Sequence, residues 1–250
     1  KEKDGYLAII NSDLDKASDY VKSLLPLPIK NDFFEINWKI VSSSRLGGDS
    51  FGYHWIDAEN FAIYILDVTG HGVGAALHTI AALNALKYQT LTNTDFKDPK
   101  QVLDALNKAF QMSEHNSLFI TMWYCVFNTK RNELYYSGAA HPPIIVINPN
   151  GEMKKISSQN TVVGFDQETE FTSDTMRIES KSSLYLYTDG AYEIDLQNGV
   201  TMQIDNLIEF LCENENEDFS EIERLYQHLK QLNKCDHLDD DFTMIKVKFC

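Results

Sequence analysis

Acidic residues recur along this chain where an apolar run gives way to a turn. The four places are Asp49 after Gly47-Gly48, Asp67 in Asp67-Val68-Thr69-Gly70-His71-Gly72, Asp189 in Tyr187-Thr188-Asp189-Gly190, and Asp239-Asp240-Asp241 before the last apolar run. A carboxylate that follows a buried strand is costly to desolvate unless a partner neutralises its charge. Carboxylates, backbone carbonyls and water are the oxygen ligands that Mg²⁺ or Mn²⁺ prefers. The pattern therefore predicts a site for hard divalent cations.

Each of these pieces has an ordinary structural explanation when it is taken alone. An Asp-Gly pair at a strand end is commonly a hairpin turn, and three consecutive aspartates commonly form a solvated acidic loop. The neighbouring glycines, however, let the backbone come close enough to add a carbonyl ligand. The order of all four pieces along one chain favours the metal site.

Strands and helices must bring these aspartates together. Runs of β-branched and aromatic residues predict strands over 38–43, 61–68, 118–128, 133–137, 144–148, 171–178, 184–187 and 242–249. Helical spacing of apolar residues predicts helices over 74–91, 98–112, 204–212 and 219–232, the second of them capped by Asp98-Pro99. Few βα units alternate, which argues against a doubly wound parallel sheet. We expect an α+β fold of two stacked, mostly antiparallel sheets flanked by helices.

The first 28 residues predict a separate linker helix ahead of one domain over 29–250. Apolar residues at alternating spacings of four and three form a short seam, made of Ile10, Leu14, Ala17, Val21 and Leu24. Such a seam is typical of a coiled coil or of a helix docked on a partner. Barely two heptads leave two alternatives open, packing on its own domain and dimerisation. In either case the helix is a candidate for passing a signal to residues 70–91.

Composition and charge exclude several classes of partner. The 250 residues carry a formal net charge of -15, which disfavours nucleic acid and anionic membranes, because lysine and arginine bind both. No run approaches the ~20 apolar residues of a membrane helix, and no secretion signal opens the chain. The four cysteines lack the spacing of a zinc site or a disulfide framework. We expect a cytoplasmic protein.

Several longer motifs occur in a fixed order over nearly the whole chain. They are Leu24-Leu25-Pro26, Gly47-Gly48-Asp49, Asp67-Val68-Thr69-Gly70-His71-Gly72-Val73-Gly74-Ala75-Ala76-Leu77, Gly138-Ala139-Ala140-His141-Pro142-Pro143, Tyr187-Thr188-Asp189-Gly190 with Glu193, and Asp240-Asp241-Phe242-Thr243. This order resembles the PPM family of metal-dependent protein phosphatases, in particular its bacterial SpoIIE-like and RsbU-like branch. The resemblance implies an αββα sandwich, with a PPM-type phosphatase domain over 29–250.

The resemblance also implies the ligands of two Mn²⁺ or Mg²⁺ ions. Asp67 matches the aspartate that bridges both ions, and the Val68 carbonyl is a further ligand. Asp49, Asp189 and Asp240 match the other carboxylate ligands, with Asp241 as the alternative to Asp240. A water held between the two cations would attack the phosphorus of a phosphoserine or phosphothreonine in line with the leaving oxygen.

Two further residues are candidates for catalysis. His71, four residues after Asp67, is the candidate for protonating the leaving oxygen. The alternatives are that this histidine bonds the turn or helix start, or that a water on the metal supplies the proton. Arg45, four residues before Asp49, is the candidate for binding the phosphate through two hydrogen bonds. The alternative is that Arg45 is solvated at the surface. His141, before two prolines, has an architectural role as its simplest explanation.

Two positions depart from the pattern of the branch. Gly52 replaces the second aspartate of Gly-Gly-Asp-x-x-Asp, which puts the affinity for one ion in question. Ala140 replaces the glycine of Gly-His-Pro-Pro, a change that matters little unless this residue needs positive φ. Gly52 keeps a second function open, a catalytically weak metal-binding signalling module that binds a partner without dephosphorylating it. A phosphatase of small molecules is a third.

The resemblance further implies partners. The expected substrate is a phosphorylated regulatory protein of a bacterial partner-switching or two-component pathway, such as an anti-sigma-factor antagonist. An upstream sensory or receiver domain would govern the activity, and a homodimer would fit the N-terminal seam.

Overall fold

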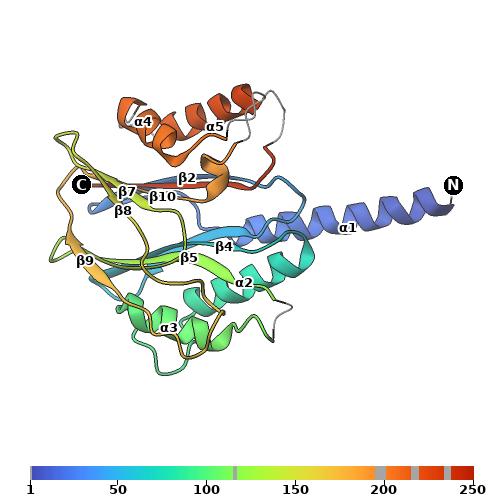
Figure 1. Ribbon diagram of the computed structural model, residues 1–250, viewed down its shortest axis with the longest axis horizontal. Helices are drawn as coiled ribbons and strands as arrows, with labels where there is room; N and C mark the ends of the chain where they lie inside the picture. The colour runs from blue at the N-terminus through green and yellow to red at the C-terminus, as the bar shows by residue number, and fades with distance from the viewer. Residues whose placement is uncertain (1, 115–116, 195–200, 215–219, 234–237) are drawn as a thin grey trace.

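Two antiparallel β-sheets lie face to face, and helices cover both outer faces (Figure 1). The structure is a computed structural model that describes residues 2–114, 117–194, 201–214, 220–233 and 238–250. Phe219, the predicted first residue of one helix, and Cys235 lie outside the described residues. The order of the layers is helix, sheet, sheet, helix, which confirms the predicted αββα sandwich.

The two sheets divide the strands unequally. The first sheet has the order β1-β2-β11-β10-β7-β8, with β1 (Ile29–Lys30), β2 (Phe34–Val41), β7 (Ile144–Ile147), β8 (Met153–Ile156), β10 (Ser183–Tyr187) and β11 (Phe242–Phe249). The second has the order β3-β4-β5-β6-β9, with β3 (Asp49–Trp55), β4 (Asn60–Val68), β5 (Ile120–Asn128), β6 (Glu133–Ala139) and β9 (Asp174–Arg177). Every neighbouring pair is antiparallel. Sequence-distant strands therefore lie side by side, as β2 and β11 do.

Both faces of the central strands are buried, which explains their nearly continuous apolar sequences. Because successive side chains of a strand point to opposite faces, Ile63 and Ile65 of β4 enter the core between the sheets, whereas Tyr64 and Leu66 pack toward the helices. Three apolar cores result, one between the sheets and one under each helical layer. The sheets are thus fixed to one another as well as to their helices.

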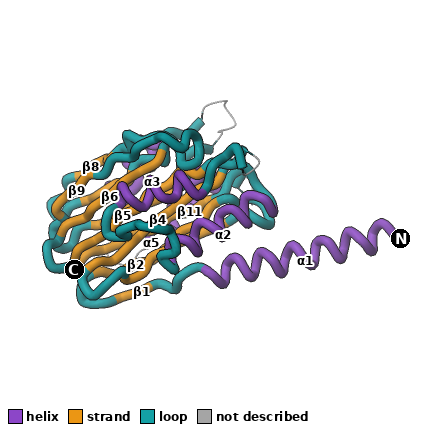
Figure 2. The backbone as a smooth tube through the Cα atoms, turned by 90° about the horizontal axis from the view of Figure 1, so that it is seen from below, coloured by secondary structure: helices purple, strands orange, loops and turns teal. Residues whose placement is uncertain are grey.

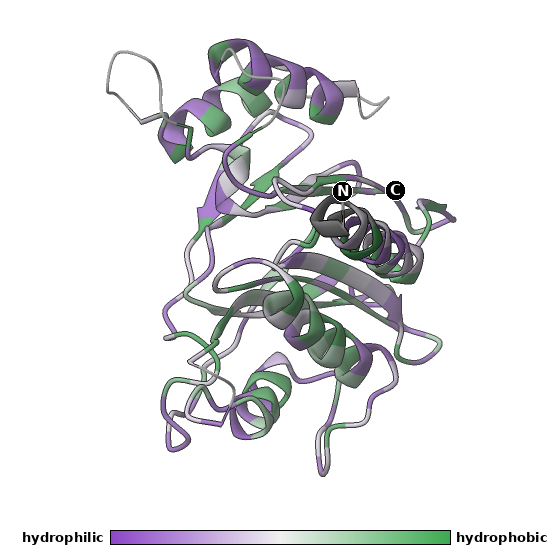
Figure 3. Cartoon of the chain, turned by 90° about the vertical axis from the view of Figure 1, so that its right-hand side faces the viewer, coloured by the Kyte–Doolittle hydropathy of each residue, from purple (hydrophilic) through white to green (hydrophobic). Residues whose placement is uncertain are grey.

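The helices cover the two outer faces in pairs (Figures 1 and 3). Their bounds are α1 (Glu2–Leu24), α2 (Val73–Lys87), α3 (Pro99–Ala109), η1 (Asp189–Ala191), α4 (Ile204–Asn214) and α5 (Ser220–Asn233). Helices α2 and α3 lie on the second sheet, and α4 and α5 lie on the first. In Figure 3, hydrophobic and hydrophilic residues share each of α4 and α5, as expected for helices with one buried face.

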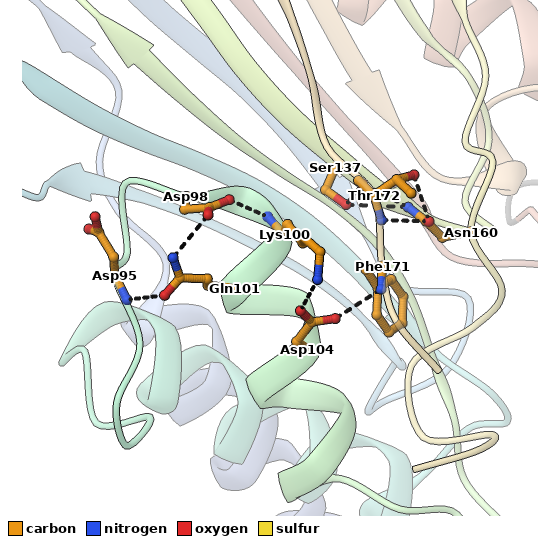
Figure 4. Close-up of polar contacts among 9 residues, drawn as sticks. All are labelled: Asp95, Asp98, Lys100, Gln101, Asp104, Ser137, Asn160, Phe171 and Thr172. Carbon is orange, nitrogen blue, oxygen red and sulfur yellow. Dashed lines mark hydrogen bonds and ion pairs between the residues drawn. The ribbon is translucent and has the colours of Figure 1, made fainter. Parts of the chain in front are cut away.

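Polar contacts cap α3 and join it to the segment that leads into β9 (Figure 4). The Asp98 side chain accepts a hydrogen bond from the Lys100 N–H at 3.0 Å, so the predicted cap of this helix is confirmed. One turn later, the Asp104 side chain accepts a hydrogen bond from the Phe171 N–H at 2.9 Å. Helix α3 therefore also holds the segment that leads into β9.

Some predicted elements differ from the structure. Strand β3 was not predicted, because Gly52 interrupts its apolar sequence, and the two short strands β1 and β8 were missed as well. The predicted strand over 171–178 is wrong for half of its length, since only Asp174–Arg177 pairs with β6. Its first residues instead bond to α3 and to Asn160. Contacts between distant segments thus override the local β propensity there.

Helix α1 extends away from the sandwich (Figures 1 and 2). The seam residues from Leu14 to Leu24 are half-buried, whereas Ile10 is 55% exposed and Tyr6 and Ile9 are exposed. The end of the helix that lies near the domain therefore packs on it, and the projecting end presents apolar side chains to solvent. Within the described residues, no helix combines the length and apolar character needed to cross a membrane.

Candidate metal centre and active site

A cavity of about 600 Å³ opens where several strands of the two sheets end. Its walls are formed by Ser43, Ser44, Gly48, Asp67, Thr69, Gly70, His71, Asp189, Asp239, Asp240 and Asp241. Asp67 is the second-last residue of β4, Asp189 follows β10, and the triple aspartate precedes β11. The fold therefore brings three of the four predicted acidic places to one cavity.

The fourth place, Asp49, lies directly beside Asp67 and is buried. The two aspartates are opposite each other in the β3–β4 ladder. The other contacts of Asp49 come from two hydroxyls, Thr188 Oγ1 at 2.6 Å and Thr243 Oγ1 at 2.8 Å, which both donate to its Oδ2. Asp49 thus joins the second sheet to β10 and β11 behind the cavity, although it does not line the wall.

Sequence reasoning did not select Thr188 and Thr243. The two threonines lie inside the motifs Tyr187-Thr188-Asp189-Gly190 and Asp240-Asp241-Phe242-Thr243, in which only the aspartates are predicted as site residues. The available signal was a threonine close in sequence to a predicted ligand, one residue before Asp189 and three residues after Asp240.

Crowding of carboxylates dominates the electrostatics of the site. Burial, followed by the charges of Asp189, Asp240 and Asp241, raises the pKa of Asp67 to about 7. Burial and the Asp67 charge hold the pKa of Asp49 well above its ordinary value, against the hydroxyl hydrogen bonds that favour its ionised form. Like charges at short range disfavour ionisation of one another. The two carboxyls therefore hold their protons more tightly than isolated carboxyls do, and bound cations would offset the repulsion between their charges.

Burial and neighbouring acids also raise the pKa of Asp189 and Asp240. For Asp189 the neighbours are Glu193 and Asp241, and for Asp240 they are Asp189 and Asp241. The whole cavity wall thus favours a positive counter-charge.

The residues of the cavity fit hard divalent cations. In the described part of the chain, no three His, Cys, Asp or Glu side chains already surround a single point as in a closed metal site. Mg²⁺ seldom needs such a cage, because it keeps several waters and is usually held by one or two carboxylates. Asp67, Asp189 and Asp240 present carboxylates to a space large enough for ions with their waters.

Two glycines let the loop before β3 approach the acidic residues. A Cβ atom on Gly48 would collide with the Val68 carbonyl oxygen, and one on Gly47 would collide with the Asp241 carboxylate. Both obstacles are groups that cannot move freely, so a side chain at either glycine would displace the site. The Gly47-Gly48 pair is therefore required by close packing around the acidic cluster.

Asp240 and Asp241 occupy different environments although both line the cavity. Asp240 is exposed, and its Oδ1 accepts a hydrogen bond from the Asp241 N–H at 2.7 Å. Asp241 is buried, and its Oδ1 accepts two hydrogen bonds from Ser43, from the N–H at 2.8 Å and from the hydroxyl at 3.0 Å. Asp240 is the better placed of the two for a ligand, because its carboxylate has fewer competing protein donors.

The other predicted site residues divide between the cavity and its surroundings. His71 is exposed on the cavity wall, whereas Val68 has a buried side chain and lies behind Gly48. The structure does not bring Arg45 to the cavity wall. Its Nε lies 3.1 Å from Asp15 Oδ1, and its guanidinium also bonds Asn11, so this side chain lies against α1. A role for Arg45 in binding phosphate remains a prediction.

Gly52 does not remove a carboxylate from the cavity wall. Strand β3 directs Asp49, Phe51 and Tyr53 toward the space between the sheets, so position 52 faces the helical layer instead. A Cβ atom there would lie 2.6 Å from the ring of Tyr64, its partner in the β3–β4 ladder. Packing against Tyr64 explains the glycine, and a side chain at this position would point away from the ions.

Ala140 has positive φ, so the loss of the usual glycine does carry a cost. Its φ is 47°, in the left-handed region that costs a non-glycine residue roughly 1–2 kcal/mol. The next residue, His141, is buried between the sheets, and its ring nitrogens lie 2.8 Å from Thr121 Oγ1 and 3.1 Å from the Tyr187 carbonyl oxygen. Burial lowers the pKa of His141 to about 3, so its ring is neutral.

Comparisons with known proteins agree with this architecture. The Stage II sporulation protein E (SpoIIE) family model matches residues 57–249. The chain is 28% identical over 241 residues to the phosphoserine phosphatase RsbP of Bacillus subtilis (strain 168), a match that covers 94% of this chain and 58% of RsbP. The chain therefore spans less than two thirds of that relative.

Two solved structures share the fold at low sequence identity. The SiaA-PP2C domain of Pseudomonas aeruginosa superposes with a TM-score of 0.81 at 18% identity, covering 98% of this chain and 99% of that domain. A crystal structure of RsbX in complex with magnesium gives a TM-score of 0.67 at 16% identity, covering 90% and 99%. The residues that the SpoIIE family model matches, 57–249, contain Asp67, Asp189 and Asp240. This chain belongs to the SpoIIE family, the branch of the PPM phosphatases that its motifs resemble.

Proposed function

We propose that this chain is a metal-dependent protein phosphatase that hydrolyses phosphoserine or phosphothreonine with two Mn²⁺ or Mg²⁺ ions. The observation that carries the proposal is the convergence of Asp67, Asp189 and Asp240 on one cavity. Membership of the SpoIIE family, the phosphoserine phosphatase activity in the name of RsbP, and the magnesium bound by RsbX support it.

The residues of the site would have different roles in the hydrolysis. Asp67, Asp189 and Asp240 would hold the cations, with Asp49 and the Val68 carbonyl as the further proposed ligands. When bound, the cations lower the pKa of a water and neutralise the charge of the phosphate. His71, exposed on the same wall, would donate a proton to the serine or threonine oxygen as it leaves.

The direct test measures phosphate release from a phosphoserine peptide with Mn²⁺, Mg²⁺ or EDTA. We expect turnover with either cation and none with EDTA. Asp67→Asn keeps the size of the side chain but removes the charge, so it should abolish turnover. Asp57→Asn is a matched control, because Asp57 caps a turn at the far end of β4.

Turnover that persists with EDTA, or that Asp67→Asn leaves unchanged, would contradict the proposal. Competition between phosphopeptides and small phosphorylated metabolites in the same assay tests the third alternative, a phosphatase of small molecules. The second alternative, a metal-binding module without activity, depended on Gly52. Gly52 packs on Tyr64 away from the cavity, so it gives no support to a catalytically weak metal-binding module.

We further propose that the substrate is a phosphorylated regulatory protein of a bacterial partner-switching or two-component pathway, such as an anti-sigma-factor antagonist. The acidic surface implied by the net charge of -15 would suit a partner with basic residues near its phosphate. Screening purified phosphoproteins of this class against metabolite phosphates, by their kcat/KM values, tests the substrate class.

The projecting part of α1 supports a partner at the N-terminal end. Tyr6, Ile9 and Ile10 are 63%, 60% and 55% exposed, and the helix offers them on the part that extends from the domain. We propose that this helix pairs in a homodimer and links the phosphatase domain to an upstream sensory or receiver domain. The double substitution Ile9→Glu and Ile10→Glu should then halve the mass measured by light scattering. Leu27→Glu, at a position that is 82% exposed outside the helix, is the control.

A further inference from the structure

His141 bonds two strands that belong to different sheets. One of its ring nitrogens, Nε2, lies 3.1 Å from the carbonyl oxygen of Tyr187 in β10, and the other, Nδ1, lies 2.8 Å from the hydroxyl of Thr121 in β5. The space between stacked sheets is normally filled with apolar side chains from their inner faces. His141 therefore has a position that packing alone does not require.

The Tyr187 carbonyl explains why a histidine is needed here. Tyr185 pairs with Ile145 in the β7–β10 ladder, and the same register two residues further on places Pro143 opposite Tyr187. Proline has no N–H to donate. Because a carbonyl oxygen only accepts, His141 Nε2 must carry the proton and replace the missing donor.

The second ring nitrogen is fixed by the first. A neutral imidazole with its proton on Nε2 has an acceptor at Nδ1, so the Thr121 hydroxyl donates to it. Thr121 lies directly opposite Asp67 in the β4–β5 ladder, and opposite residues project from the same face of a sheet. Tyr187, at the other end of the bridge, is two residues before Asp189. One rigid ring thus connects the strand positions beside Asp67 and Asp189.

The backbone before His141 is held in a strained conformation. Ala140 has a φ of 47°, and its N–H donates to the Asn160 carbonyl oxygen at 3.0 Å. Strained backbone of this kind persists only where the surrounding contacts require it. The contacts that hold Ala140 in this conformation therefore also fix the position of the His141 imidazole that follows it.

We propose that His141 is a positioning residue that fixes the separation between Asp67 on one sheet and Asp189 on the other. The proposal rests on the proposed function, because the two carboxylates are taken as ligands of the cations. Residues that hydrogen-bond directly to metal ligands typically change metal affinity by ~10–100-fold when they are replaced, and His141 lies one residue further from the ions, behind Thr121 and Tyr187. His141 would act through the carboxylates, since it does not line the cavity.

The test measures the dissociation constant for Mn²⁺ from the electron paramagnetic resonance signal of free Mn²⁺. Thr121→Val keeps the shape of the side chain and removes the hydroxyl, and His141→Gln removes the ring. We expect both variants to bind Mn²⁺ about 10–100-fold more weakly than the unaltered protein, at temperatures where all are folded by circular dichroism. His54→Gln is the control, because His54 lies near the other end of β3, where its Nδ1 is 3.5 Å from the Tyr64 hydroxyl.

Three outcomes are distinguishable. Weaker binding by Thr121→Val and His141→Gln, with His54→Gln unchanged, supports the positioning role. Equal affinity for Mn²⁺ in the Thr121→Val variant and the unaltered protein would overturn it, even if His141→Gln fails to fold. If the unaltered protein binds no Mn²⁺, the proposed metal-dependent function itself fails, and the positioning role fails with it.

Discussion

Among the residues on the cavity wall, His71 has the role that is easiest to separate from metal binding. A serine oxygen is a poor leaving group and needs a proton as its bond to phosphorus breaks, whereas p-nitrophenolate leaves without one. If His71 supplies that proton, His71→Gln should lower kcat on a phosphoserine peptide by about 10²-fold or more. The same variant should change kcat on p-nitrophenyl phosphate little. An equal loss on both substrates would point to a structural role instead.

Ala140 provides a test of the strain at the site. A left-handed alanine is disfavoured by roughly 1–2 kcal/mol, while glycine adopts this conformation freely but loses more entropy on folding. We expect Ala140→Gly to stabilise the protein by up to about 1 kcal/mol, measured by urea unfolding. The matched change Ala62→Gly, in the middle of β4, should destabilise it. A loss of stability with Ala140→Gly would contradict the assigned backbone conformation.

The residues that could be predicted from the sequence are those whose position follows from the end of a strand. Asp67, Asp189 and Asp240 come together because each ends or precedes an apolar strand. The bonds from Thr188 and Thr243 to Asp49 join residues 139 and 194 positions apart, so they depend on how the two sheets stack. No local pattern encodes that stacking. The position of Arg45 against Asp15 escaped prediction for the same reason.

At the scale of elements, a buried ion pair attaches α5 to the first sheet. Lys246 of β11 and Glu221 of α5 are both fully buried and bond each other, and the Tyr185 hydroxyl donates to the same Glu221 oxygen at 2.9 Å. Removing Glu221 takes away the carboxylate that neutralises the buried Lys246 ammonium, and breaking a buried ion pair in this way is strongly destabilising. Glu221→Gln should therefore lower the free energy of unfolding by about 3–5 kcal/mol in urea titrations.

The double variant Glu221→Gln with Lys246→Met is the control for that loss. It removes both charges, so most of the stability should return. A double variant that is less stable than Glu221→Gln alone would show that the pair itself contributes most of the stability.

The elements themselves were predictable where their sequences are long and periodic. Strands β4, β5 and β11 and helices α2 and α5 appear within a few residues of their expected positions. Strand β3 was not, because the requirement for Gly52 comes from the Tyr64 ring on the neighbouring strand. Short edge strands such as β1 and β8 depend on their partners more than on their own residues.

At the scale of the whole molecule, the acidic cavity should make the metal-free protein less stable as pH rises. Asp67 has a folded pKa of about 7 against an ordinary value of 3.8. The folded state therefore binds more protons than the unfolded state between these values, and stability falls as pH rises through this window. From pH 5 to pH 7.5 the loss due to Asp67 should be about 2–3 kcal/mol.

Urea unfolding in EDTA at the two pH values measures this loss. Asp67→Asn should lose less stability over the same interval, since its amide does not titrate. Mn²⁺ at pH 7.5 should restore stability to the unaltered protein by binding its folded state. An equal change in stability between pH 5 and pH 7.5 for the metal-free unaltered protein and for Asp67→Asn would contradict the assigned electrostatics.

We propose above that carboxylates at the strand ends of both sheets hold a pair of divalent cations in one cavity. A crystal grown with Mn²⁺ and measured at the manganese absorption edge tests it directly, because anomalous scattering locates each ion independently of the refined coordinates. We expect two anomalous peaks in the cavity, with Asp67 between them and Asp189 and Asp240 in contact. A cavity without a peak in saturating Mn²⁺, or peaks found only elsewhere on the surface, would contradict it.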